Sequence, residues 1–184
     1  MIGKIRKLIP QKAINLGKHL PEAVAANVVN SFPSRGITVI GVTGTDGKTT
    51  TVNMIFRILK DAGKKVSMIS TVEAYVAGKS YDTGLHVTSP SAWDVQRFIT
   101  LSRRFGDEFL VLEVTSHALD QHRFLGVKFD VGVLTNVTHE HLDYHKTFAN
   151  YLNAKLKLIK KARVAVVNQG VRGIGGVNGK LVTF

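Results

Sequence analysis

The sequence predicts an α/β domain of the P-loop type, with three α/β/α layers around a mostly parallel sheet. Short runs rich in β-branched residues alternate with longer stretches of helical periodicity, and a glycine-rich turn joins the first run to the first such stretch. The 184 residues suffice for one domain with a full core and are too few for two ordinary domains. We therefore expect one doubly wound domain.

The elements follow from these patterns in order. Parallel strands buried on both faces are expected from five continuous apolar runs, 37–43, 65–71, 109–115, 130–136 and 163–168. Helical periodicity predicts helices over 48–62, 91–104 and 147–161. Residues 73–83 alternate around Gly78 and Lys79, which indicates a hairpin, the glycine-rich stretch 170–179 predicts a loop, and the closing KLVTF predicts a further strand. A basic helical extension is expected over residues 1–36, ahead of the main domain, which is expected over residues 37–184.

The formal net charge of +12 is concentrated in the two flanks of the chain. Residues 144–184 hold eight Lys or Arg and no acid, whereas residues 37–143 are close to neutral. No aromatic residues interleave with these charges, so we expect solvated faces or a surface for an acidic partner, and no nucleic-acid site. The chain lacks cysteine, a signal peptide and any apolar stretch that could span a bilayer, which predicts a cytoplasmic protein without membrane insertion.

A phosphate-binding loop is predicted at GVTGTDGKTTT (41–51), between the first strand and the first helix. A glycine-rich turn at a helix N-terminus directs backbone N–H groups and the positive end of the helix dipole at an anion. Lys48 can then reach the β- and γ-phosphates, and the Thr49 hydroxyl can ligate Mg²⁺. Val42 occupies a glycine position of the full Walker pattern, so the match is to a shorter form. The alternative is an ordinary helix start with a glycine turn.

Three further features carry candidate chemistry. Glu113 ends the strand FLVLE, where a P-loop protein needs a second metal-holding acid; alternatively it binds backbone amides of the next loop. HEHLDYH (139–145) could be a zinc site or an acid–base cluster, although its spacing is not that of a zincin helix. Lys155 shares one helix face with Phe148, Leu152 and Ile159, which favours its neutral amine unless it extends past the core to solvent.

Three segments, GTDGKTTT (44–51), LEVTSHALDQHR (112–123) and TNVTHEHLDYHKTFANYLNAK (135–155), together resemble the Mur ligase family. The likeness covers residues 37 to about 168, the family's central ATP-binding domain. Within the family, the second segment is most similar to the ligases that add the third residue to UDP-N-acetylmuramoyl-L-alanyl-D-glutamate. The resemblance implies an ATP-dependent ligase of peptidoglycan precursor synthesis, in which the substrate carboxylate is phosphorylated and the acyl phosphate is attacked by an incoming amino acid.

The resemblance also implies roles for individual residues. ATP phosphates would be held by Gly44, Thr45, Asp46, Gly47, Lys48, Thr49 and Thr50. A first Mg²⁺ would be held by Thr49 and Glu113, and a second by His141 with a carbamylated Lys155. The acceptor, the UDP-linked dipeptide, would contact Thr88, Ser89, Thr115, Gln121 and Arg123, although such residues are also common helix caps and turn formers. His139 and His145 receive no role and are expected at the surface or in hydrogen bonds.

The chain departs from the family pattern in several places. Asp46 replaces the usual asparagine of the loop, Glu140 stands where many relatives have aspartate, and the Asp-Asn-Pro-Arg motif of the C-terminal amino-acid-binding domain is absent. We therefore expect a ligase fragment or truncated relative whose missing domain, or a partner chain, completes the site. The alternatives are a non-catalytic MgATP-binding module that acts through a partner, a folylpolyglutamate-synthase-like ligase, and a basic nucleic-acid-binding NTPase.

Overall fold

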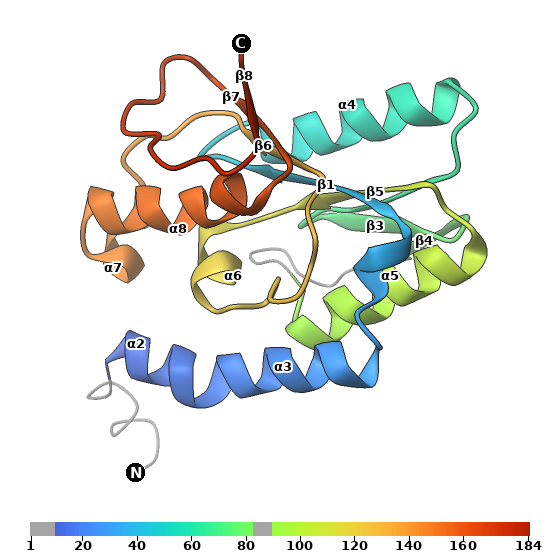
Figure 1. The fold of residues 1–184 in the computed structure, drawn as a ribbon, viewed down its shortest axis with the longest axis horizontal. Coiled ribbons are helices and arrows are strands. Elements are labelled where there is room, and N and C mark those ends of the chain that lie inside the picture. Colours follow the sequence, from blue (N-terminus) through green and yellow to red (C-terminus); the bar gives the residue numbers. More distant parts are fainter. Residues whose placement is uncertain (1–9, 83–89) are drawn as a thin grey trace.

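The structure of the protein, a computed structural model, describes residues 10–82 and 90–184. Thr88 and Ser89, which the sequence suggests as acceptor contacts, lie outside the described residues. The described chain forms an α/β domain with helices on both faces of one mixed sheet (Figure 1). None of the described helices is long and apolar enough to cross a membrane.

The sheet has eight strands in the order β4-β3-β2-β5-β1-β6-β7-β8. Their bounds are β1 Thr38–Thr43, β2 Val66–Ile69, β3 Glu73–Val76, β4 Lys79–Asp82, β5 Phe109–Glu113, β6 Val131–Leu134, β7 Val164–Val167 and β8 Lys180–Thr183. The pairs β2–β3 and β3–β4 are antiparallel, and all other neighbours are parallel. The mostly parallel sheet, the edge hairpin and the final strand predicted from KLVTF are therefore confirmed.

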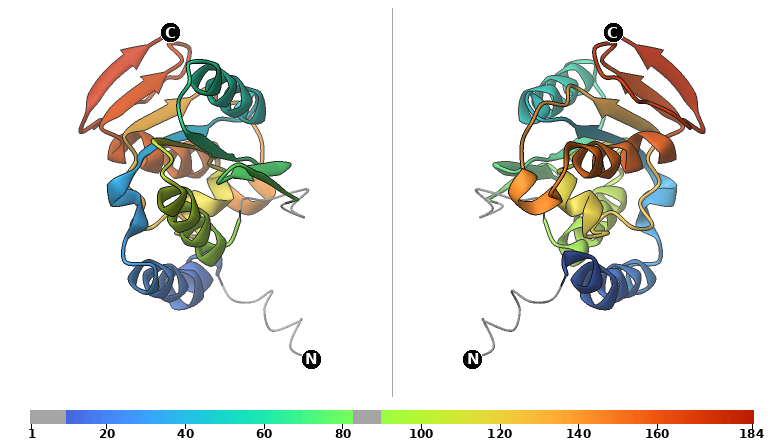
Figure 2. Two further views of the ribbon diagram at one scale, coloured as in Figure 1. Left: turned by 90° about the vertical axis from the view of Figure 1, so that its right-hand side faces the viewer. Right: turned by 90° about the vertical axis from the view of Figure 1, so that its left-hand side faces the viewer.

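Helices cover both faces of this sheet. α4 (Lys48–Asp61) lies on one face, and α5 (Ala92–Phe105), α6 (Ser116–Asp120) and α8 (Phe148–Lys161) lie on the other (Figures 1 and 2). The short α7 (Leu142–His145) precedes α8. The three long helices begin and end within about two residues of the predicted bounds, because Gly47, Ser91 and Thr147 provide their N-caps.

The N-terminal segment forms an additional helical layer. α2 (Gln11–Ile14), the π-helical turn η1 (Asn15–His19) and α3 (Leu20–Val29) follow one another without a break and run along the outer side of α5 and α6 (Figure 1). Phe32 then adopts a left-handed conformation, and the 3₁₀ turn η2 (Pro33–Gly36) leads into β1. The helical segment therefore ends at Val29, and residues 30–36 connect it to the sheet.

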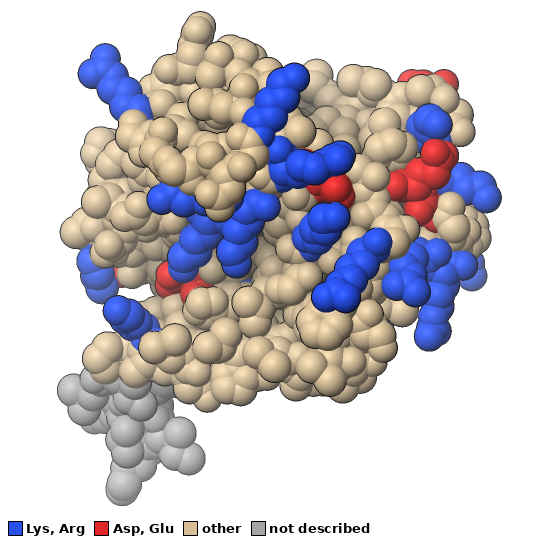
Figure 3. Space-filling view, viewed as in Figure 1, with Lys and Arg blue, Asp and Glu red and all other residues tan. Residues whose placement is uncertain are grey.

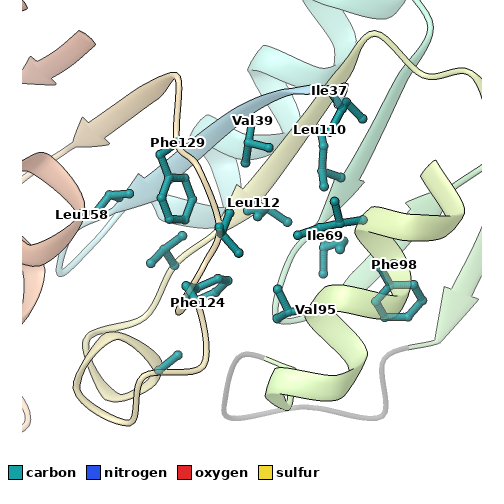
Figure 4. Close-up of a cluster of buried hydrophobic side chains, with 14 of the residues drawn as sticks. Ile37, Val39, Ile69, Val95, Phe98, Leu110, Leu112, Phe124, Phe129 and Leu158 are labelled. Atoms are coloured by element: carbon teal, nitrogen blue, oxygen red, sulfur yellow. The ribbon is translucent and has the colours of Figure 1, made fainter. Parts of the chain in front are cut away.

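Side chains of the central strands alternate between two cores. Leu110 and Leu112 pack with Phe98 and Phe129 beneath α5 and α8 (Figure 4), whereas Val111 faces the cluster under α4. On β1, a Cβ at Gly41 would lie 2.7 Å from the Phe129 ring and 2.9 Å from Leu158 Cδ1 of α8, so glycine permits a close approach there. This close approach brings α8 against the sheet and fixes where its side chains meet the loops that follow β1, β5 and β6.

Candidate nucleotide and acceptor site

The loop that the sequence predicts to bind phosphate joins β1 to α4, in the strand–loop–helix order expected for it. Gly47 caps the helix with φ 75°, a left-handed conformation that favours glycine. No side chain caps this end of α4, and Thr51 is the first residue whose N–H donates to the preceding turn, at Gly47 O, 2.9 Å. The amides of residues 48–50 therefore lie at the positive end of the helix dipole, where an anion is stabilised.

Glu113 is the buried carboxylate beside this loop. It lies at the carboxyl end of β5, is 3% exposed, and its Oε2 accepts hydrogen bonds from Thr49 Oγ1 at 2.9 Å and from Thr71 N at 3.1 Å. The carboxylate thus faces the Thr49 hydroxyl, and its role in holding a metal ion stays a prediction; it also binds a backbone amide, although not one from the loop after β5 that the alternative names. The amide belongs to the loop after β2, and sequence reasoning missed Thr71.

The loop after β6 clamps the phosphate loop from the other side. Asn136 Oδ1 accepts hydrogen bonds from Thr45 N at 3.0 Å and Asp46 N at 2.8 Å. Thr135 Oγ1 donates to Asp46 O at 2.7 Å and lies against Gly44, where a Cβ would come within 1.8 Å of this oxygen. The amides of Thr45 and Asp46 are thus bound within the protein, which leaves those at the start of α4 for an anion.

Lys155 reaches the same loop from α8. Its side chain is only 1% exposed, its Nζ donates to Gly44 O, and it lies 4.4 Å from the centroid of the Tyr151 ring. The phenol of Tyr151 in turn contacts Thr45 Oγ1 at 3.0 Å. Burial, together with the nearby Lys48 ammonium, lowers the pKa of Lys155 to about 7. The alternative in which this lysine extends to solvent is wrong.

The three histidines of HEHLDYH lie in different surroundings. His141 has φ 54°, is exposed, and lies 3.7 Å from a Glu140 carboxylate oxygen. His145 is buried against Ser116 Oγ at 3.1 Å, and burial, aided by His117, lowers its pKa to about 4. His139 stacks on Phe148. In the described part of the chain no three His, Asp or Glu side chains are arranged to hold a metal ion.

His117 connects His141 to the rest of the site. Its ring lies 4.9 Å from that of His141 and 4.2 Å from that of Tyr144. Burial lowers its pKa, so the ring favours the neutral form. His141 also packs 5.9 Å from Tyr151, which touches the phosphate loop. One edge of the sheet therefore carries His141, Lys155, Glu113 and Lys48. Sequence reasoning missed His117.

The three described acceptor candidates behave differently. Thr115 caps α6 by accepting a hydrogen bond from Ala118 N, as the capping alternative predicts. Gln121 Oε1 accepts two hydrogen bonds from the Arg123 guanidinium, at 2.9 and 2.6 Å, and Arg123 also donates to Pro90 O. Gln121 and Arg123 are thus bound to each other, and Gln121 Nε2 also donates a hydrogen bond to Tyr144 Oη at 3.4 Å.

Comparison with known proteins gives this arrangement a family. Residues 42–172 match the model of the Mur ligase middle domain. A UDP-N-acetylmuramoyl-L-alanyl-D-glutamate–2,6-diaminopimelate ligase from Clostridium botulinum is 41% identical over 136 residues, which are 74% of this chain and 28% of that protein. A UDP-N-acetylmuramyl-tripeptide synthetase from Treponema pallidum is 43% identical over 69% of this chain and 24% of its own length.

Solved structures show the same fold. A UDP-N-acetylmuramoyl-L-alanyl-D-glutamate–2,6-diaminopimelate ligase superposes with a TM-score of 0.73 at 23% identity, over 92% of this chain and 36% of the other. Escherichia coli FolC in complex with DHPP and ADP gives 0.68 at 19% identity, over 90% and 46%. This chain therefore spans roughly a third of the length of these Mur-type relatives, 28% and 36% in the two diaminopimelate ligases. The chain belongs to the Mur ligase family, and residues 42–172 are its middle domain.

Proposed function

We propose that this chain is the ATP-binding, carboxylate-activating part of a ligase that adds an amino acid to UDP-N-acetylmuramoyl-L-alanyl-D-glutamate. The observation that carries the proposal is the buried Glu113 carboxylate, which faces the Thr49 hydroxyl next to an uncapped helix N-terminus. Family membership and the names of the relatives support the reaction class and the acceptor.

The residues around Glu113 fit Mg²⁺. Mg²⁺ prefers oxygen ligands and is commonly bound by one or two protein oxygens together with substrate phosphates and waters. Glu113 Oε2 and Thr49 Oγ1, 2.9 Å apart, provide such a pair beside the phosphate loop, without a closed protein cage. Mg²⁺ bound there would neutralise phosphate charge. Lys48, which in this structure donates to Thr45 O at 2.7 Å, would turn to the terminal phosphates.

Lys155 and His141 would serve the acceptor side. The neutral amine of Lys155 has the protonation state that reacts with CO₂, forming an N–C bond with loss of one proton to give a carbamate. That carboxylate, beside Gly44 O and with His141 at the rim, would support a second Mg²⁺ near the terminal phosphate. We assign the acceptor to Gln121 and Arg123, whose guanidinium can pair with a carboxylate.

The chemistry assigned to the chain is positioning and charge neutralisation. An oxygen of the acceptor carboxylate attacks the terminal phosphorus of ATP, ADP leaves, and an acyl phosphate forms. The amine of the incoming amino acid then attacks the acyl carbon, and phosphate leaves as the amine loses a proton. Because no covalent nucleophile is needed, fixed cations and oriented amides can supply most of the rate enhancement.

Calorimetric titration with ATP, with and without Mg²⁺, tests the nucleotide assignment. We expect Mg²⁺-dependent binding by the wild type, loss of at least tenfold in affinity for Lys48→Ala, and no change for Lys160→Ala, an exposed lysine at the end of α8. Absence of binding by a folded wild type would contradict the assignment.

Phosphate release from ATP tests the acceptor assignment. We expect release to depend on UDP-N-acetylmuramoyl-L-alanyl-D-glutamate and to fall for Arg123→Lys, which keeps the charge and removes the bidentate geometry. If a folate substrate stimulates release instead, the folylpolyglutamate-synthase-like alternative would replace this proposal. MgATP binding without release in either case would favour the non-catalytic binding module.

A further inference from the structure

The N-terminal helical segment, residues 11–29, packs against residues 121–126, here called the acceptor loop because it carries the proposed acceptor contacts (Figure 1). Figure 3 shows that Lys and Arg side chains gather on the face above this segment, whereas few lie on the segment itself. The contact is made by small apolar side chains and by buried amides such as Asn27, whose Nδ2 donates to Leu125 O. The segment lies outside residues 42–172, the part that matches the family model.

Asn15 provides a second contact, with the residue that precedes the acceptor loop. Its side chain is buried, and its Nδ2 donates to Asp120 Oδ2 at 2.7 Å and to Asp120 O at 3.2 Å. Its Oδ1 accepts a hydrogen bond from Gln11 Nε2 at 2.9 Å. Because both ends of the amide are occupied, Asn15 is held with its donor toward Asp120.

Asp120 gives the next hydrogen bond its direction. Burial raises the pKa of this carboxyl, but its donors, among them Lys157 Nζ at 3.1 Å and Tyr144 Oη at 3.2 Å, hold the pKa below its ordinary value, so Asp120 is ionised and can only accept. Burial raises the pKa of Tyr144, so its phenol keeps the hydrogen that it donates to Asp120. The phenol oxygen is then left to accept from Gln121 Nε2, at 3.4 Å.

This order of donors and acceptors fixes the Gln121 side chain. With Nε2 toward Tyr144, its Oε1 faces the Arg123 guanidinium and accepts from Nε at 2.9 Å and from Nη2 at 2.6 Å. The reversed amide would place donors against donors. Burial lowers the pKa of Arg123, and the Glu22 carboxylate of α3 opposes this lowering, so the segment also favours the charged guanidinium.

We propose that the N-terminal helical segment is a positioning element of the acceptor site, in which Asn15, Asp120 and Tyr144 set the orientation of the guanidinium that meets the acceptor carboxylate. The inference rests on the proposed function for the identity of the acceptor, and on the hydrogen bonds alone for the orientation of Arg123. The three residues act through Gln121. Because each group orients the next, removing any one should loosen the guanidinium, and removing two should add little.

Hydrogen exchange of the Arg123 Nε–H tests the orientation without any ligand. In the ¹⁵N-labelled full chain this signal, identified by its loss in Arg123→Lys, should exchange slowly because Nε donates to Gln121 Oε1. Asn15→Leu and Tyr144→Phe should each speed the exchange about fivefold. The double variant should exchange about as fast as either single variant, because both changes break the same series of hydrogen bonds.

Asn30→Leu is the matched control, the same substitution near the other end of the segment. Asn30 Oδ1 accepts from Thr100 Oγ1 of α5 at 3.2 Å, so this variant weakens the attachment of the segment without touching the acceptor loop. Its Arg123 exchange should equal that of the wild type. Unchanged exchange in Asn15→Leu, or equally fast exchange in Asn30→Leu, would overturn the proposal. Thermal melting checks folding, and Tyr144→Phe, which removes only a hydroxyl, gives the same test if Asn15→Leu does not fold.

Calorimetry with UDP-N-acetylmuramoyl-L-alanyl-D-glutamate and, separately, with MgATP relates the orientation to binding. Asn15→Leu should bind the acceptor about fivefold more weakly and MgATP as tightly as the wild type. Equal affinity of both proteins for the acceptor would overturn the positioning role and leave the proposed function standing. No acceptor binding by the folded wild type, together with the expected exchange rates, would refute the proposed function and leave the orientation of Arg123 by the segment standing.

Discussion

Replacing Lys155 by methionine should change how the stability of the protein depends on pH. Lysine has a pKa of about 10.4 in an unfolded chain, whereas burial holds the pKa of Lys155 at about 7 in the folded protein. Between these two values the unfolded state binds one proton more than the folded state, so the free energy of unfolding rises with pH. The slope approaches about 1.4 kcal/mol per pH unit, or roughly 4 kcal/mol between pH 7 and 10.

Lys155→Met keeps most of the buried volume and removes the titrating amine. The free energy of unfolding of the variant should therefore not rise with pH in this way. At pH 7 the variant should be more stable than the wild type by up to roughly 4 kcal/mol, minus the stabilisation that is lost with the hydrogen bond to Gly44 O. Urea unfolding at pH 7, 8 and 9 in CO₂-free buffer measures both proteins, and titration of every other group cancels in the difference. A difference that stays constant across this pH range would refute the reasoning.

The same amine can be observed directly. With ¹³C-labelled CO₂, the wild type should give a carbamate carbon signal at pH 8, because a large part of Lys155 is then neutral. Lys155→Met should lose the signal, and Lys157→Met, which removes the Asp120-paired lysine of the same helix, should keep it. A signal that survives in Lys155→Met would place the carbamate elsewhere.

Three further substitutions probe the loops around the site. Asn136→Ala removes the acceptor of two phosphate-loop amides and should weaken MgATP binding about tenfold by calorimetry; unchanged affinity would mean that the loop is held without it. Gly44→Ala places a Cβ 1.8 Å from Thr135 Oγ1 and should lower the midpoint of urea unfolding, and an unchanged midpoint would contradict this close packing. Asp120→Ala leaves its donors without their acceptor and should cost about 1–3 kcal/mol of unfolding free energy, with faster proteolysis of the N-terminal helical segment; equal proteolysis would show that apolar contacts alone hold that segment.

Features that depend on local sequence could be predicted. Apolar runs identified the strands, and the 3.6-residue period identified the long helices and placed Lys155 on the buried face of α8. Glu113 was identified because an acid at the end of an apolar run stands out. The expected roles of these residues in binding ATP and Mg²⁺ remain predictions.

Features that depend on strand order could not be predicted in the same way. Asn136 contacts Thr45 across 91 residues because β6 lies next to β1, and Thr71 contacts Glu113 because β2 lies next to β5. Hydrophobic periodicity does not specify which strands are neighbours. His117 was missed for a related reason, since its contact with His141 requires α6 and α7 to lie side by side.

The phosphate loop is attached to the segment 135–155, so the proposed nucleotide and acceptor sides of the site are thermodynamically linked. Thr45 binds Asn136, Thr138 and Tyr151, so a nucleotide that shifts this loop must also shift residues leading to His141 and Lys155. If nucleotide binding changes the affinity for the acceptor by some factor, acceptor binding changes the affinity for nucleotide by the same factor. A substitution at Asn136 should therefore reduce that coupling without removing a side chain that is proposed to bind either ligand.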